Sequence, residues 1–224
     1  MILVPVAGLV VVPVDPVPTE PVRRAASWAG LDLGPGQEAA LAGFTGWLRD
    51  EALPAGGVGP DEGGRIVPRH VADSLLFAGV WWGDRPPRTL LDVGSGVGLP
   101  GLPLAIAWPE TAVTLLDRAE RRTRLARRAV RVLALDNVTV VTSPLRRHRE
   151  RYDLVVMRAV FPLPEAVAAV LPVLGAPGTA GLALSRQEAP PLPAEPPGWR
   201  FQVVAVPPTV LDSPAWILRM AAIE

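Results

Sequence analysis

Short runs of aliphatic and β-branched residues alternate with helical segments between residues 89 and 184 of this 224-residue chain. The runs lie at 89–93, 112–117, 137–141, 152–157 and 179–184, and the helical segments lie at about 99–108, 119–135 and 164–174. Because the runs are apolar almost throughout, we expect both faces of their strands to be buried. This alternation predicts an α/β fold with a mainly parallel sheet.

Two further runs, 200–206 and 215–223, stand near the end of the chain. Pro207, Pro208 and Pro214 lie between them, and no helical pattern separates them. We therefore expect a terminal antiparallel strand pair at one end of the sheet.

Helical spacing also marks the first part of the chain. One helix is predicted at 37–53 and a second at 68–82, with the glycine-rich loop 54–64 between them. The apolar side of the first helix consists of Leu41, Phe44, Trp47 and Leu48. These two helices are expected to form an N-terminal cap.

Two residue types are missing from the chain, and their absence excludes several kinds of chemistry. Without cysteine there are no disulfides, no cysteine-bound zinc or iron–sulfur cluster, and no thiolate nucleophile. All 22 basic residues are arginine, so a Schiff-base lysine and a phosphate-binding-loop lysine are excluded as well. We expect no metal site.

The formal net charge is zero, but the charge is unevenly distributed. Residues 118–151 contain eleven arginines and three acidic residues, so this segment carries a net charge of +8. A basic segment on a neutral protein indicates an anionic partner that binds locally.

A glycine-rich turn follows the first predicted strand, with the sequence Asp92-Val93-Gly94-Ser95-Gly96-Val97-Gly98-Leu99. Glycines let the backbone approach a ligand closely, and the next helix points free N–H groups toward it. The third glycine stands at position 98, one residue earlier than in the usual dinucleotide-binding pattern. An acid such as Asp92 beside the glycines suits the amino-acid end of a ligand better than a pyrophosphate.

The second strand ends at Asp117, where a carboxylate can accept hydrogen bonds from both hydroxyls of a ribose. Together with the DxGxGxG turn and the terminal antiparallel pair, this acid favours S-adenosylmethionine as the cofactor over NAD. The predicted fold is therefore a class I, Rossmann-like methyltransferase fold with a helical N-terminal cap. Its candidate cofactor-binding residues are Asp92, Gly94, Ser95, Gly96, Gly98 and Asp117.

We predict three units along the chain. Residues 1–21 form an extended Pro-rich arm, residues 22–84 form the helical cap, and residues 85–224 form the S-adenosylmethionine-binding methyltransferase domain. The arm lacks the charged start and the cleavage site of a signal peptide, which favours a cytoplasmic location.

Three segments resemble one known family: VGSGVGLPGLPLAI at 93–106, RHVADSL at 69–75 and MRAV at 157–160. They are similar to the RsmG/GidB family, bacterial methyltransferases that modify N7 of a guanine in 16S rRNA. The resemblance covers about residues 65–186. It implies that Gly94, Leu99, Leu145, Arg146 and Arg158 contact the cofactor, and that His70 and Asp73 form a polar rim beside it.

The chain departs from the family pattern at three places. Arg146 stands where members usually carry Glu, and Leu184-Ser185-Arg186-Gln187 replaces a segment that contains Lys. An Asn-Leu-Thr element is missing before 69–75, where the glycine-rich loop 54–64 stands instead. These departures bear on the substrate more than on the cofactor.

The residues also narrow the methyl acceptor. Methylation at carbon 5 of a pyrimidine needs a cysteine nucleophile, and the loop after the fourth strand lacks the motif used for exocyclic amines. Guanine N7 already carries a lone pair, so its methylation needs placement rather than a base. We therefore name no catalytic residue.

Arginines recur at helical spacing in the segment 119–135, and these are the candidate RNA-binding residues: Arg121, Arg124, Arg128 and Arg131. The expected partner is 16S rRNA or the small ribosomal subunit, with no membrane partner. The sequence does not determine the oligomeric state, and a monomer is favoured. Ordinary solubilising charge is the alternative interpretation of these arginines.

Three other functions remain open from the sequence. The same fold could methylate a small molecule, or it could be a non-catalytic RNA-binding paralogue that has lost turnover. An NAD-dependent oxidoreductase is disfavoured by the glycine spacing. Salt-dependent RNA binding and methyl transfer discriminate between the first two.

Overall fold

The computed structural model describes residues 20–59, 64, 66–184 and 191–223. Most of the predicted arm, residues 1–19, lies outside these residues, as does Ser185 with the segment that follows it. The arm was predicted to reach residue 21, but Glu20 already begins helix α1 (Glu20–Trp28). Pro21 fits the helix because it occupies the first turn, where a missing N–H costs nothing.

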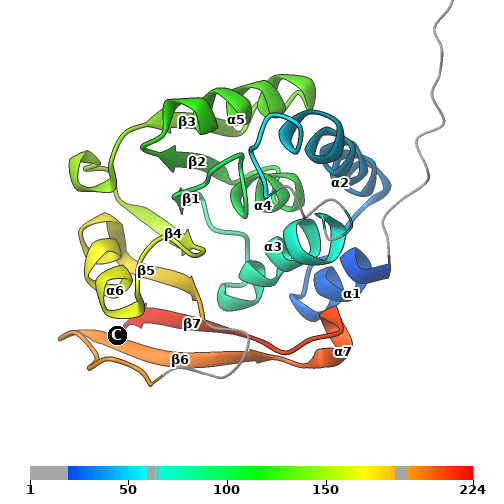
Figure 1. The fold of residues 1–224 in the computed structure, drawn as a ribbon. Helices are drawn as coiled ribbons and strands as arrows, with labels where there is room; N and C mark the ends of the chain where they lie inside the picture. Colours follow the sequence, from blue (N-terminus) through cyan, green and yellow to red (C-terminus); the bar gives the residue numbers. More distant parts are fainter. Residues whose placement is uncertain (1–19, 60–63, 65, 185–190, 224) are drawn as a thin grey trace, which may run out of the picture.

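A seven-stranded sheet forms the centre of the molecule, in the order β3-β2-β1-β4-β5-β7-β6 (Figure 1). Its strands are β1 (Thr89–Val93), β2 (Ala112–Asp117), β3 (Val138–Thr142), β4 (Tyr152–Met157), β5 (Leu174–Ala183), β6 (Trp199–Val206) and β7 (Ala215–Ala222). Strands β1 to β5 pair in parallel, and β7 pairs antiparallel with both β5 and β6. The predicted parallel sheet with a terminal antiparallel pair is confirmed.

Two details of the last strands differ from the prediction. Strand β5 begins at Leu174 rather than 179, because a register shift in its pairing with β4 accommodates the Gly-Ala-Pro-Gly segment, as expected for Gly and Pro at a bulge. A one-turn helix, α7 (Pro208–Leu211), separates β6 from β7, where we had expected only a turn. Pro208 is compatible with a helix because it stands at its start.

Helices cover the sheet and supply the cap. They are α2 (Pro35–Trp47), η1 (Leu48–Ala52), η3 (Ile66–Ala72), α3 (Asp73–Leu75), η4 (Leu76–Val80), α4 (Gly101–Ala107), α5 (Glu120–Val132), η5 (Leu145–Arg147), α6 (Leu163–Val170) and η6 (Leu171–Val173). The first predicted cap helix is confirmed as α2 with the π-helical turn η1. The second is confirmed as the continuous run from η3 to η4. Helix α1 was not predicted as a separate element.

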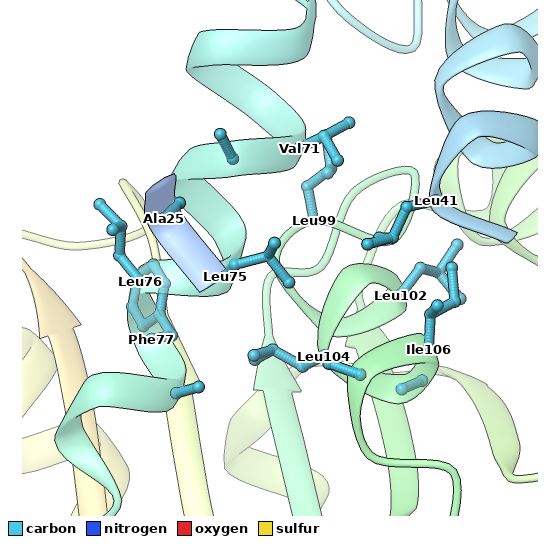
Figure 2. Close-up of a cluster of buried hydrophobic side chains, with 14 of the residues drawn as sticks. Ala25, Leu41, Val71, Leu75, Leu76, Phe77, Leu99, Leu102, Leu104 and Ile106 are labelled. Atoms are coloured by element: carbon cyan, nitrogen blue, oxygen red, sulfur yellow. The ribbon is translucent and has the colours of Figure 1, made fainter. Parts of the chain in front are cut away.

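The cap and one face of the sheet share one hydrophobic core. Figure 2 shows Leu41 of α2 and Val71 of η3 meeting Leu99, Leu102 and Ile106 around α4. Helix α6 packs into a second cluster, which is formed by the opposite side of the strands (Figure 1). The predicted boundary between cap and methyltransferase domain at residues 84 and 85 therefore crosses a continuous core and stays a prediction.

Candidate functional site

The glycine-rich turn leaves β1 at the centre of the sheet and is tied to the neighbouring strand. Gly94 N–H and Ser95 N–H both donate to the carbonyl oxygen of Leu116, at 2.7 and 3.1 Å. Gly94 has a φ of 70°, and a Cβ atom built on it would lie 2.4 Å from Cγ2 of Val160. The turn thus needs glycine here for its conformation and for the close approach of the loop after β4.

Asp92 lies fully buried beneath this turn. Its Oδ2 accepts a hydrogen bond of 2.7 Å from Gly101 N–H at the start of α4, which fixes where that helix begins. Its Oδ1 has no hydrogen-bond partner among the described residues. Burial raises the pKa of Asp92 to about 7, although the Gly101 hydrogen bond and the charge of Arg158 oppose the rise.

Asp117 closes β2 and is almost fully buried, at 4% exposure. Its Oδ2 accepts a hydrogen bond of 3.0 Å from Gly96 N–H, and its Oδ1 accepts one of 2.8 Å from Ala119 N–H. The guanidinium of Arg122 lies 3.9 Å from Oδ2. Because each carboxylate oxygen has two lone pairs, both oxygens retain acceptor capacity.

A pocket of about 430 Å³ opens between the turn, the end of β2 and the loops after β3 and β4. The predicted cofactor residues that line it are Gly94, Asp117, Leu145 and Arg146. Arg118, Arg122 and Phe161 also line it and were not predicted. No sequence motif points to these three residues. The signal that could have found two of them is position, because Arg118 directly follows Asp117 and Phe161 lies in the loop after β4.

The other predicted cofactor residues lie outside the lining of this pocket: Asp92, Ser95, Gly96, Gly98, Leu99 and Arg158. Leu99 is 7% exposed and belongs to the core shared with the cap. Arg158 donates to Asp73 at 3.1 Å, and this largely buried ion pair joins the end of β4 to α3. Cofactor contacts from these residues stay a prediction.

The four candidate RNA-binding arginines project from α5 and differ in their partners. Arg121 donates to the carbonyl oxygen of Ala55, and Arg128 forms an ion pair with Glu51. Arg124 lies 4.0 Å from Glu120, and Arg131 is exposed. Two of the four thus fasten α5 to the cap, a role that spacing along one helix does not reveal.

Within the described part of the chain, no group of three or more His, Asp or Glu side chains is placed to hold a metal ion. None of the described helices is long and apolar enough to cross a membrane.

The chain is similar to one protein family over most of its length. The family model GidB, described as rRNA small subunit methyltransferase G, matches residues 44–189. Ribosomal RNA small subunit methyltransferase G from Roseiflexus castenholzii is 40% identical over 160 residues, which cover 69% of this chain and 67% of that protein. The protein of the same name from Acidothermus cellulolyticus is 38% identical over 141 residues, which cover 63% of this chain and 62% of that protein. The chain thus spans about two thirds of these relatives, and half of another from a Roseiflexus species.

Solved structures of low identity share the fold. Magnesium protoporphyrin IX methyltransferase from Synechocystis, with bound S-adenosylmethionine, matches with a TM-score of 0.55 at 20% identity, over 82% of this chain and 97% of that one. A mutant of MtNAS in complex with S-adenosylmethionine matches with a TM-score of 0.59 at 14% identity, over 83% and 73% of the two chains. The predicted Rossmann-like methyltransferase fold is confirmed.

Asp92→Asn is expected to change how stability depends on pH. Because the folded pKa of Asp92, about 7, exceeds its ordinary value of 3.8, the neutral carboxyl stabilises the fold at low pH. This contribution falls by about 1.4 kcal/mol per pH unit as pH rises from the ordinary to the folded pKa, and then levels off. Between pH 5 and 8 the wild type should lose about 3 kcal/mol relative to the variant. Urea unfolding of both proteins at each pH measures this difference in unfolding free energy. A difference that stays constant between pH 5 and 8 would contradict the raised pKa of Asp92.

Gly94→Ala and Gly96→Ala form a matched pair, because both glycines have a positive φ. A Cβ atom at Gly94 meets Val160, whereas one at Gly96 has no neighbour within 4 Å. We expect Gly94→Ala to weaken S-adenosylmethionine binding about 100-fold and Gly96→Ala to weaken it less than about tenfold. Isothermal titration calorimetry measures both affinities.

Val160→Ala is the control for this steric explanation. Combined with Gly94→Ala, it should restore part of the lost affinity, because it removes the methyl groups that the new Cβ meets. Equal losses in the two glycine variants, with no rescue, would show that the contact with Val160 is unimportant.

Proposed function

Because the chain belongs to the GidB family of rRNA small subunit methyltransferases, we propose that it methylates guanine N7 in 16S rRNA with S-adenosylmethionine as methyl donor. The observation that carries this proposal is the pocket at the carboxyl ends of β1 and β2, where Gly94 and Asp117 meet. Ligands of doubly wound sheets bind at this edge of the strands.

The residues present fit the cofactor. Asp117 offers the remaining lone pairs of its carboxylate to the ribose hydroxyls, and Leu116, Pro144 and Leu145 offer apolar surface to the adenine. Asp92 Oδ1 and Ser95 Oγ are buried at the glycine turn, and neither has a partner among the described residues. Buried polar atoms without partners are ones that a polar ligand or water satisfies. When bound, S-adenosylmethionine supplies an electrophilic methyl group.

The protein's own contribution is placement and exclusion of water. Among the residues that line the pocket, the ionisable ones are Asp117 and three arginines, Arg118, Arg122 and Arg146. Arginine side chains only donate hydrogen bonds, and the remaining lone pairs of Asp117 are the ones assigned to the ribose, so the proposal gives none of these groups the role of a base. Guanine N7 needs no base, because it attacks through its own lone pair.

The direct test measures tritium transfer from labelled S-adenosylmethionine to small ribosomal subunits that lack the N7 modification. We expect label in 16S rRNA that is released as 7-methylguanine. Gly94→Ala, assayed on the same subunits, is the matched control with weakened cofactor binding. Cofactor binding without label in rRNA would contradict the proposal and would leave a small-molecule acceptor or a non-catalytic RNA-binding protein, which RNA binding then separates.

Arg124→Gln with Arg131→Gln is expected to weaken RNA binding without changing cofactor affinity, because both side chains are exposed on α5, away from the pocket lining. Loss of two phosphate contacts should reduce the slope of log affinity against log salt by about 1.5. Fluorescence anisotropy with an rRNA fragment over a salt series measures the slope.

Arg200→Gln is the control for that experiment, since Arg200 is an exposed arginine on β6, outside the basic segment. An unchanged slope in the Arg124 and Arg131 variant, or an equal change in the control, would assign these charges to solubility alone.

A further inference from the structure

A second pocket, of about 240 Å³, adjoins the first and has no role in the function described so far. The two pockets share Ala159, Val160 and Phe161, the loop that follows β4, so this loop forms a common wall. The other side chains that line the second pocket are apolar and come from the ends of β4 and β5 and from α6. Met157, Leu163, Leu182 and Leu184 belong to this part.

The order of the strands places the two pockets side by side along one edge of the sheet. The first pocket follows the ends of β3, β2, β1 and β4, whereas the second follows the ends of β4 and β5. If Asp117 binds the ribose at the end of β2, the methyl group of the cofactor lies at the other end of the pocket, near Gly94 and the common wall. A methyl acceptor must reach that end from outside the cofactor pocket, and the second pocket lies next to it.

The lining of the second pocket suits the flat face of a base. Phe161 is 42% exposed, so part of its ring surface is available to a ligand, while Met157 and Leu182 are buried beneath the pocket. Enzymes that modify nucleobases take the target base out of its stack into a pocket that contacts its faces. Stacking of one base on an aromatic side chain contributes about 1–3 kcal/mol.

We propose that this second pocket binds the acceptor guanine, with Phe161 as the residue that stacks on the base and positions it. The proposal rests on the proposed function. It also concerns the product, because methylation at N7 gives the purine ring a positive charge. An aromatic face attracts such a ring more strongly than a neutral one. The pocket therefore prefers 7-methylguanine to guanine.

Leu184→Trp separates this pocket from the cofactor site, and Phe161→Leu tests the aromatic side chain of the wall that the two pockets share. Leu184→Trp narrows the second pocket, and Leu184 does not line the first. Phe161→Leu removes the aromatic face but keeps an apolar side chain. Trp82→Leu is the matched control, since Trp82 is an exposed aromatic residue, 57% exposed, that lines neither pocket.

The experiment titrates each protein with GMP and 7-methyl-GMP by ligand-detected NMR, and with S-adenosylmethionine by calorimetry. The wild type should bind 7-methyl-GMP more tightly than GMP. Phe161→Leu should abolish this preference. Leu184→Trp should weaken the binding of both nucleotides about tenfold, because the stacking energy of one base is lost. Trp82→Leu should bind both nucleotides like the wild type, and Leu184→Trp should keep wild-type affinity for S-adenosylmethionine.

The outcomes distinguish this inference from the proposed function. No nucleotide binding to the wild type, or equal binding to the wild type and both pocket variants, would overturn the inference. If the Leu184→Trp variant transferred label to rRNA as fast as the wild type, the inference would also be overturned, while the proposed function would stand. The two predicted nucleotide effects, together with no transfer of label to rRNA by the wild type, would support the pocket and reject 16S rRNA as substrate.

Discussion

The buried carboxyl group of Asp92 is the constraint on which the glycine turn and its pocket depend. One oxygen holds the N–H of Gly101, so α4 begins directly beneath the turn. Gly101 has no room for a side chain, because a Cβ atom there would lie 2.3 Å from Leu115 and 2.8 Å from Asp92 Oδ2. The acid, the helix start and the neighbouring strand are therefore packed as one unit. Burial of this carboxyl group lowers the stability of the fold at neutral pH. Such unfavourable burial is typical of functional sites.

The basic segment is partly structural. Arg128 and Arg121 join α5 to Glu51 and to the carbonyl oxygen of Ala55, and the Arg128 contact lowers the pKa of Glu51. These contacts hold the end of the first cap helix against the methyltransferase domain, beside the apolar packing that joins the cap to α4. The exposed part of α5 carries no such role, and further arginines of the segment, Arg118, Arg122 and Arg146, line the pocket.

Much of the fold follows from local patterns. The strands β1 to β4 and the helices α2, α4 and α5 were predicted close to their observed bounds, because apolar periodicity and turn residues act over a few neighbours. Three features were missed for a common reason. Helix α1, the early start of β5 and the one-turn helix α7 each contain Pro or Gly where such residues usually end an element, and tertiary packing accommodates them at a helix start or a bulge.

The sequence by itself determined the parallel sheet, the glycine turn after β1 and the acid at the end of β2, because each depends on residues that are adjacent in the chain. Only the tertiary structure decided which side chains line the pocket. Arg122 and Phe161 reach it from a helix and a loop, whereas Leu99 packs in the core and Arg158 pairs with Asp73, outside the lining of this pocket. A local pattern states which backbone conformation a segment adopts. It does not state which distant segment packs against it, and that packing decides whether a side chain faces a ligand or the core.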